Sequence, residues 1–194
     1  MTAEATPPPR RIETPRLLLR AWDPDDAPLL RSAIDRSLDH LRPWMPWARE
    51  EPRSMEDTRE LLEGFRETFE AGDDFVYGIF DRNETEVLGG TGLHPRIGPG
   101  GLEIGYWIRV DRTGEGLATE AARAMMEAGS ALPGIERIVI KCDPENEASR
   151  RIPEKLGFTL RDRLENDAET PMGEPRDTLV FEISTTRESE ASPG

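Results

Sequence analysis

The stretch EIGYWIRVDRTGEGLATEA, residues 103–121, reads as a strand, a glycine-containing loop and the start of a helix. Gly114 and Gly116 in the loop lack side chains, so the backbone can turn sharply and approach a ligand closely. The first amides of the following helix have no acceptor within it, and with the helix dipole they form an anion site suited to a pyrophosphate. Ordinary turn chemistry would also explain two such glycines, so the stretch needs support from the rest of the chain.

Two better-known phosphate loops do not fit this stretch. A Walker loop needs a Lys-Ser or Lys-Thr pair after its last glycine, and none follows Gly116. The six-residue dinucleotide pattern needs glycine or alanine at its last position, where Thr119 stands. Glu115 suits a phosphate site only if its side chain points away and backbone amides bind the ligand.

Hydrophobic periodicity and capping residues predict the elements around this stretch. Strands are expected over residues 16–22, 75–80, 87–95, 102–110, 135–142, 158–164 and 178–184. Helices are expected after Asp23, between Ser54 and Gly72, from Leu117, and from Asn146 to just before Gly157. The short turns that join the second, third and fourth strands favour antiparallel hairpins. This order predicts a mixed α/β domain built on one central sheet.

Length and charge limit the organisation and the partners of the chain. Its 194 residues suit one domain, placed at residues 12–184 between disordered tails at 1–11 and 185–194. The formal net charge of −14 repels phosphate backbones, so we expect no nucleic-acid partner. The same charge would attract a cationic amine, although a plain solubility effect explains it as well.

Neither a targeting segment nor a membrane span is expected. The start of the chain lacks a basic segment followed by an apolar one, and no apolar run approaches the roughly 20 residues that cross a bilayer. Cys142 is the only cysteine, so the chain cannot form an internal disulfide. His40 and His94 lie far apart without ligand spacing, so we expect no metal site. We expect a cytoplasmic protein.

Several further motifs, in register over about residues 12 to 184, support a ligand-binding reading of the loop. They are ETPRLLLR (13–20), EIGYW (103–107), LATEA (117–121), IVIKC (138–142), NEAS (146–149) and EKLGF (154–158). Together they resemble the RimJ/RimL-like branch of the GNAT acetyltransferases. The resemblance implies the GNAT fold, a mostly antiparallel central sheet flanked by about four helices.

The resemblance implies acetyl-CoA as co-substrate, bound by the loop and by the end of the preceding strand. The expected binding residues are Ile108, Arg109, Val110, Arg112, Thr113, Gly114, Glu115, Gly116, Leu117, Ala118 and Asn146. The pantetheine arm would pair with residues 107–110, and the Ile108 amide would face the thioester oxygen. Asp111 stands where the family motif has Gln or Arg, and Arg112 would supply the missing positive charge.

The resemblance also suggests catalytic residues, each with a plainer alternative. Glu103 occupies a position where some family members carry the general base, but it also fits a solvent-facing strand carboxylate, and His94 is a second candidate. Pro153 replaces the usual tyrosine acid, so Ser149 is the candidate acid, although it is also an ordinary first-turn residue. Asn146 would orient the pantetheine, cap its helix, or do both.

Aromatic residues and the cysteine complete the candidate site. Trp44, Trp47, His94 and Tyr106 are the candidate acceptor-binding residues. For the two tryptophans, a hydrophobic cluster under a loop is an equal alternative. Cys142 could suggest an acyl-cysteine intermediate, but it has no evident His or Asp partner, so we interpret it as a core or pocket-lining residue.

The predicted reaction is acetyl transfer from acetyl-CoA to a primary amine in a ternary complex, with no covalent enzyme intermediate. The resemblance favours the N-terminal amine of a protein such as a ribosomal protein. A small-molecule amine, polyamine or antibiotic is the alternative acceptor. Weaker alternatives are a non-catalytic CoA-binding module and a nucleotide-binding regulator. The sequence leaves the oligomeric state open, with a homodimer among the states it allows.

Overall fold

The computed structural model describes residues 7–170 and 173–185, so residues 1–6 and 186–194 of the expected tails lie outside it. Its strands are β1 (Arg11–Glu13), β2 (Leu17–Ala21), β3 (Phe75–Asp81), β4 (Val87–His94), β5 (Gly101–Ile108), β6 (Arg137–Cys142), β7 (Thr159–Glu169) and β8 (Pro175–Ser184). Its α-helices are α1 (Ala27–Leu41), α2 (Met55–Ala71), α3 (Leu117–Ser130) and α4 (Glu147–Leu156). Short 3-10 helices are η1 (Pro24–Asp26), η2 (Pro46–Glu50) and η3 (Val110–Arg112).

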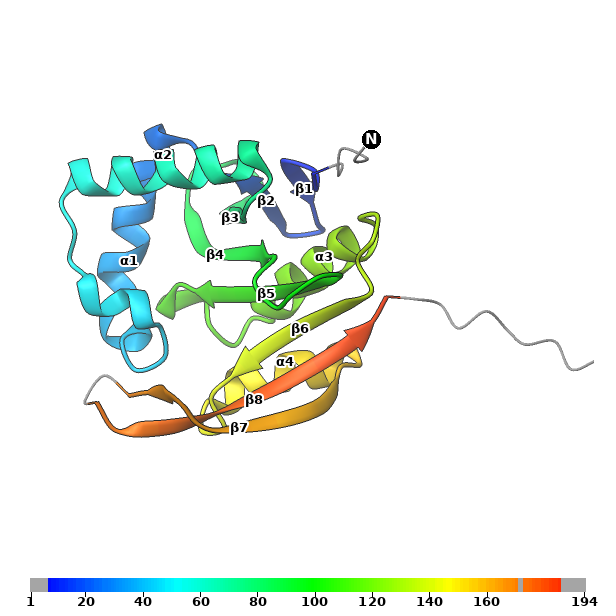
Figure 1. The fold of residues 1–194 in the computed structure, drawn as a ribbon. Coiled ribbons are helices and arrows are strands. Elements are labelled where there is room, and N and C mark those ends of the chain that lie inside the picture. Colours follow the sequence, from blue (N-terminus) through cyan, green and yellow to red (C-terminus); the bar gives the residue numbers. More distant parts are fainter. Residues whose placement is uncertain (1–6, 171–172, 186–194) are drawn as a thin grey trace, which may run out of the picture.

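The described strands form one sheet in the order β1-β2-β3-β4-β5-β6-β8-β7 (Figure 1). Among them, β5 and β6 are parallel, and every other neighbouring pair is antiparallel. Helix α3 supplies the crossover that two parallel neighbours need. This arrangement confirms the predicted mixed, mostly antiparallel sheet with four α-helices around it.

Local capping decides where the helices begin and end. Asp23 accepts a hydrogen bond from the Asp25 amide at the start of η1. Ser54 and Asp57 form a reciprocal capping box at the start of α2, which ends at Gly72 with a φ of 79°. Glycine adopts this left-handed conformation without strain. The sequence predicted these boundaries correctly because each cap involves residues only a few positions apart.

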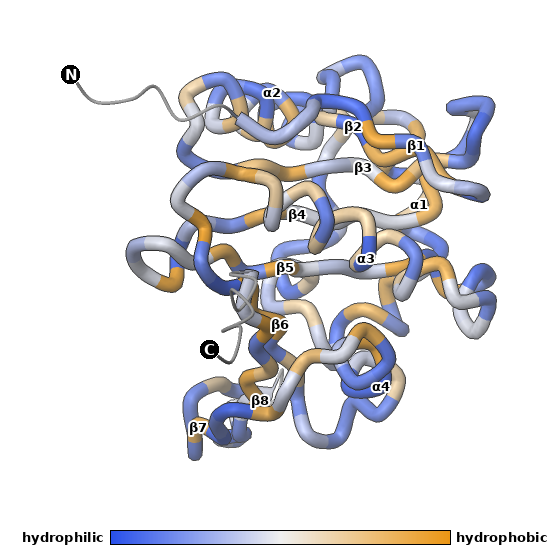
Figure 2. The backbone as a smooth tube through the Cα atoms, turned by 90° about the vertical axis from the view of Figure 1, so that its right-hand side faces the viewer, coloured by the Kyte–Doolittle hydropathy of each residue, from blue (hydrophilic) through white to orange (hydrophobic). Residues whose placement is uncertain are grey.

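The run Leu17–Leu19 on β2 contributes to two hydrophobic cores. Successive side chains of a strand point to opposite faces of the sheet. Leu17 and Leu19 therefore join the cluster that α3 and α4 cover, whereas Leu18 joins the cluster beneath α1 and α2. Figure 2 shows hydrophobic stretches along the central strands, while α4 is largely hydrophilic.

Some boundaries differ from the sequence prediction. The structure adds β1, which pairs with Leu18–Arg20 and begins inside the expected tail, and Thr185 donates its amide to the Glu136 carbonyl at 2.9 Å. β5 ends at Ile108 because Val110 already belongs to η3, and β7 and β8 are longer than expected. Side chains along β1 and β7 are mostly exposed, so hydrogen bonding to a partner strand, rather than a hydrophobic pattern, makes them strands.

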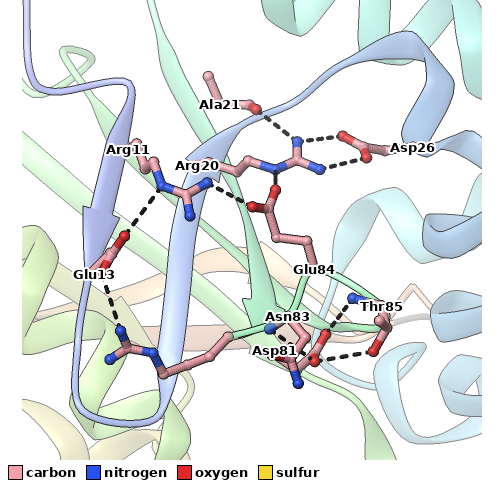
Figure 3. A network of polar contacts seen from close by, with 10 residues as sticks. Arg11, Glu13, Arg20, Ala21, Asp26, Asp81, Asn83, Glu84 and Thr85 are labelled. Carbon is pink, nitrogen blue, oxygen red and sulfur yellow. Dashed lines mark hydrogen bonds and ion pairs between the residues drawn. The ribbon is translucent and has the colours of Figure 1, made fainter.

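A network of ion pairs fastens β1 and β2 to the turn after β3 (Figure 3). Arg20 donates two hydrogen bonds of 2.7 Å to Asp26 and one of 2.7 Å to Glu84. Its guanidinium carbon also lies 3.9 Å from the centre of the Phe80 ring. Arg11 on β1 donates to the same Glu84 carboxylate at 2.7 Å. Arg20 is therefore the centre of the network.

Replacing Arg20 with methionine is expected to lower the free energy of unfolding by about 2 kcal/mol, the cost of leaving a partly buried charged group without its hydrogen bonds. The Asp26 carboxylate, with a side chain only 9% exposed, would stay desolvated without its cation. Urea denaturation followed by circular dichroism measures the loss. Arg11→Met is the matched control, because it removes a cation from the same Glu84 at a site that is 48% exposed, where ion pairs contribute little. Equal losses from both variants would contradict the central position of Arg20.

Candidate active site

β5 and β6 are paired along only half of β5. The parallel ladder joins Gly101–Ile104 to Arg137–Ile140 and ends there. β5 continues through Gly105–Ile108, while the end of β6 stays paired with β8. Figure 1 shows the two strands separating toward the end of β5. The sheet is therefore open at this point, and one edge of β5 has no strand beside it.

Two cavities occupy this opening. The first, of about 360 Å³, is lined by His40, Leu41, Trp44, Met45, Tyr106, Trp107, Ile108, Arg112, Thr113, Gly114, Gly116, Leu117, Ala118, Thr119, Asn146, Ala148, Ser149, Arg151, Ile152 and Lys155. The second, of about 270 Å³, is lined by Trp44, Met45, Pro46, Arg96, Glu103, Ile104, Gly105, Tyr106, Lys141, Cys142, Asp143, Asn146, Ser149, Asp167, Arg176, Asp177 and Thr178. Both cavities are lined by Trp44, Met45, Tyr106, Asn146 and Ser149, so they meet at these residues.

The first cavity borders the N-terminus of α3. Gly116 precedes this helix with a φ of 79°, and no described side chain caps the helix. The amides of Leu117, Ala118 and Thr119 have no acceptor inside the helix because of their position in its first turn. All three residues line the cavity. The arrangement provides backbone donors and the positive end of a helix dipole to an anion in the cavity.

The charged side chains of the glycine loop pair with each other. The Glu115 carboxylate accepts hydrogen bonds from Arg112 at 2.9 and 3.1 Å, and these bonds lower the pKa of Glu115. Glu115 does not line either described cavity, whereas Arg112 lines the first. The Glu115 carboxylate thus binds Arg112 and lies outside both described cavities. Glu115 is therefore compatible with a phosphate site at this loop.

Arg109 and Asp111 form another internal pair. Asp111 accepts from Arg109 at 2.6 and 3.2 Å, and this interaction lowers the pKa of Asp111. Arg109 is 5% exposed and also donates to the Val87 carbonyl at 3.2 Å. Arg109, Val110 and Asp111 are absent from the lining of both described cavities. Asp111, at the Gln/Arg position of the family motif, therefore anchors the end of β5.

The Ile108 amide faces the opening between the strands. The next amide, of Arg109, donates to the Leu88 carbonyl on β4 at 2.8 Å. Successive N–H groups of a strand point to opposite edges, so the Ile108 amide points away from β4. Ile108 lines the first cavity, whereas the Val110 amide donates to the Ser37 hydroxyl at 3.0 Å. Within residues 108–110, Ile108 is therefore the residue that offers a donor to the cavity.

Asn146, Ser149 and Tyr106 come together where the cavities meet. The side chain of Asn146 caps α4 by accepting the Ser149 amide at 3.1 Å. The Tyr106 hydroxyl oxygen lies 3.2 Å from the Ser149 carbonyl oxygen and 3.3 Å from its Oγ. Burial raises the pKa of Tyr106, so the phenol stays protonated. Tyr106, proposed from the sequence as an acceptor-binding residue, thus lies beside the Asn146 and Ser149 pair.

Glu103 lies in the wall of the second cavity and is not solvent-facing. It is 6% exposed, accepts a hydrogen bond from Arg96, and has the Lys141 ammonium at 3.5 Å. Burial alone would raise the pKa of Glu103, but the hydrogen bond and charge of Arg96 and the charge of Lys141 bring it below its usual value. A carboxylate with a lowered pKa is a weak base, which limits its value in proton abstraction.

The structure separates two of the candidate acceptor residues from the cavities. His94 lies opposite Glu103 on β4, but its Nδ1 is 2.6 Å from Asp74, and it lines neither described cavity. Trp47 packs on Trp107 with ring centres 5.8 Å apart, within the cluster beneath α1 and α2. Trp44 and Tyr106 line both cavities.

Other lining residues carried no sequence signal. Arg176 on β8 pairs with Asp143 at 3.1 Å and donates to the Pro43 carbonyl at 2.9 Å. It thereby joins three segments that are distant in the sequence around the second cavity. Charged residues in a polar strand are normally solvent-exposed, so no local pattern identified Arg176. The same holds for Arg96, Lys141, Asp143, Asp167 and Asp177.

Residues 7–170 and 173–185 contain neither a metal-binding cluster nor a membrane-spanning helix. No group of three or more His, Cys, Asp or Glu in this part of the chain could hold a metal ion. No helix in it is both long enough and apolar enough to cross a bilayer.

The chain is similar to known acetyltransferases. A family model described as an acetyltransferase (GNAT) domain matches residues 16–159. The uncharacterized N-acetyltransferase YoaA of Bacillus subtilis is 28% identical over 182 residues, 91% of this chain and 98% of that protein. The ribosomal protein uS5-alanine N-acetyltransferase of Escherichia coli is 28% identical over 151 residues, 76% of this chain and 77% of that protein. The structure of RimL, a ribosomal L7/L12 alpha-N-protein acetyltransferase in complex with coenzyme A, matches with a TM-score of 0.81 and 25% identity, over 90% of this chain and 97% of that one.

Proposed function

The chain belongs to the GNAT acetyltransferase family, and from this premise we propose that it transfers the acetyl group of acetyl-CoA directly to the N-terminal amine of a protein. The observation that carries the proposal is the meeting of two cavities at Ser149 and Tyr106. Two substrates can enter such a site from separate sides and react where the cavities join. Direct transfer requires both substrates to be bound at the same time in adjoining cavities. Transfer through a covalent enzyme intermediate does not require this.

The first cavity suits acetyl-CoA. The uncapped amides of Leu117–Thr119 suit its pyrophosphate, and Gly114 and Gly116 allow the backbone to come close to it. The open edge of β5 suits the amide groups of the pantetheine arm, which can pair with it like an added strand. The Ile108 amide would then donate to the thioester oxygen.

The chemistry assigned to the site is one acyl transfer. The neutral amine nitrogen forms a bond to the thioester carbon, the carbon–sulfur bond breaks, the nitrogen loses a proton and the sulfur gains one. Ile108 stabilises the oxyanion of the tetrahedral intermediate through its amide, a contribution of about 10²–10³ in rate for one such donor. Ser149 gives its hydroxyl proton to the departing sulfur and recovers a proton from water.

Glu103 is assigned to the removal of the amine proton through a water molecule. Its lowered pKa keeps it a carboxylate at neutral pH, so it can always accept a hydrogen bond from that water. Because such a carboxylate is a weak base, the acceptor ammonium has to release its proton mainly to the solvent before the amine can attack. We therefore expect the rate to rise with pH following the pKa of the acceptor amine rather than that of Glu103.

Two observations support a protein N-terminus as the acceptor. Relatives named for acetylating ribosomal proteins match this chain over most of its length. The net charge of the chain is −14, which favours the approach of a cationic partner, and the acidic residues that line the second cavity outnumber the basic ones by one, Glu103, Asp143, Asp167 and Asp177 against Arg96, Lys141 and Arg176.

Thiol release from acetyl-CoA tests the proposal. The acceptor panel holds peptides that start with Ala, Ser or Met, together with polyamines, amino acids and aminoglycosides. Turnover confined to peptides is expected. Turnover confined to small amines would replace the proposed acceptor, and acetyl-CoA binding in calorimetry without turnover on any amine would favour the non-catalytic alternative.

Cys142 provides a separate prediction on the route of transfer. Cys142 as a residue is 8% exposed, and burial together with the charge of Asp143 raises the pKa of its thiol to about 11. At neutral pH only about one thiol in 10⁴ would be the reactive thiolate. Cys142→Ala is therefore expected to keep kcat within about threefold, because volume changes in a cavity wall have small effects. A complete loss of turnover, with acetyl-CoA still bound, would instead point to an acyl-cysteine route.

A further inference from the structure

Helix α4 contains a proline at a position where proline is normally excluded. Pro153 is buried in the middle of α4 (Glu147–Leu156). It has no N–H, so it cannot donate the helical hydrogen bond to the carbonyl of Ser149, four residues earlier. The proline ring also pushes that carbonyl outward. The helix therefore loses a hydrogen bond at the residue that we assign as the acid.

The Tyr106 hydroxyl takes the place of the missing donor. It lies 3.2 Å from the Ser149 carbonyl oxygen and is the described group that satisfies it. The phenol stays protonated because burial raises its pKa, so it remains a donor at neutral pH. Tyr106 belongs to the part of β5 that lies beyond the end of the β5–β6 ladder. This hydrogen bond thus joins β5 to α4 across the opening where the two strands no longer pair.

The same hydroxyl also constrains the Ser149 side chain. Tyr106 has one hydrogen, which the carbonyl accepts, so its oxygen is left to accept the Ser149 hydroxyl at 3.3 Å. Serine inside a helix otherwise tends to donate back to a carbonyl of the preceding turn. Tyr106 therefore holds the Ser149 hydroxyl where the two cavities meet and keeps its hydrogen from turning back into the helix.

We propose that Pro153 and Tyr106 are positioning residues that together aim the Ser149 hydroxyl at the reacting centre. The proline exposes the Ser149 carbonyl, the carbonyl holds the Tyr106 hydroxyl, and that hydroxyl holds the Ser149 side chain. The effect on turnover rests on the proposed function, because it requires Ser149 to protonate the departing sulfur. The hydrogen-bond arrangement itself does not depend on the reaction.

Pro153→Val is the decisive variant. Valine has a volume near that of proline, so it fills the same buried space, and its N–H restores the helical bond to the Ser149 carbonyl. Without the proline ring, the Ser149 carbonyl is no longer pushed outward and turns back along the helix axis, away from the Tyr106 hydroxyl. That hydroxyl then keeps only its longer contact with the Ser149 Oγ, and the serine hydrogen turns back toward the helix. We expect kcat to fall about 3- to 10-fold, the value of one neutral hydrogen bond, with little change in the KM for acetyl-CoA. Pro133→Val, at an exposed turn, is the matched control and should leave kcat unchanged.

A double-mutant cycle separates positioning from general destabilisation. Tyr106→Phe should lower kcat by a similar factor, and Pro153→Val with Tyr106→Phe should be no slower than either single variant, since both changes break the same link. Independent effects would multiply to about 10- to 100-fold, and that result would overturn the proposal.

A second measurement is independent of activity. With tyrosine labelled with ¹³C at Cζ, NMR in H₂O and D₂O reports how fast each hydroxyl proton exchanges, and Tyr106→Phe assigns the signals of the two tyrosines. The Tyr106 hydroxyl should exchange slowly in the native protein and in Pro133→Val, and faster in Pro153→Val. Slow exchange in Pro153→Val would overturn the proposed link even if no acceptor amine were found. The expected exchange pattern without turnover on any amine would contradict only the proposed function.

Discussion

Replacing Gly116 with aspartate is expected to weaken acetyl-CoA binding by roughly 100- to 1000-fold. The new carboxylate would lie beside the first-turn amides of α3 and compete with the pyrophosphate for these donors. Two negative charges about 4 Å apart at a protein surface repel by about 4 kcal/mol. Arg16, the residue nearest to an added Cβ at 3.7 Å, cannot neutralise the new charge because it is already paired with Glu120 at 2.6 Å.

Backbone strain has to be separated from the loss of the anion site. Gly116 has a φ of 79°, and any other residue there is strained. Gly134→Asp is the matched control, because Gly134 has a φ of 78° with no atom within 4 Å of an added Cβ, and it lines neither cavity in the described part of the chain. Calorimetric titration with acetyl-CoA should show normal affinity for this control. Unchanged affinity in Gly116→Asp would remove the loop from the acetyl-CoA site.

Replacing Ser149 with alanine is expected to lower kcat about 100-fold while the affinity for acetyl-CoA stays within about threefold. General acids typically contribute about 10²–10⁴ in rate, and the lower end applies because a thiolate is already a good leaving group. The variant should fold normally, since alanine is a better helix former than serine. Steady-state kinetics with an acceptor found in the panel, together with calorimetry, measures both quantities.

Two further variants make the Ser149 result specific. Ser149→Thr keeps a hydroxyl at the same position and should retain more activity than Ser149→Ala. Ser130→Ala, at the exposed end of α3, should have no effect. Equal turnover of Ser149→Ala and the native protein would exclude Ser149 as the acid and would leave the direct-transfer route without an assigned proton donor.

The local part of the site could be predicted from the sequence. The loop with Gly114 and Gly116, the uncapped start of α3 and the cap at Asn146 each depend on residues within a few positions of one another. Such features are governed by backbone geometry and by nearby hydrogen bonds, so a short stretch contains the information that they need.

Burial and pairing could not be predicted in the same way. The sequence left open a solvent-facing carboxylate at Glu103, yet that residue is buried between Arg96 and Lys141. It also left open an acceptor role for Trp47, which packs on Trp107 instead. In each case the partner comes from another strand or helix, and periodicity within one element does not identify it.

The sequence by itself determined the order of the elements from β2 onward, the caps of the helices and the glycine loop, because these depend on propensities and caps that act over a few residues. The tertiary structure alone decided that β5 and β6 separate after Ile104 and that two cavities meet in the opening. It also decided that the carbonyl freed by Pro153 meets the hydroxyl of Tyr106, 43 residues from Ser149 in the chain. Contacts over such separations form only when the packing of the whole sheet brings the two segments together, so no single stretch of the sequence specifies them.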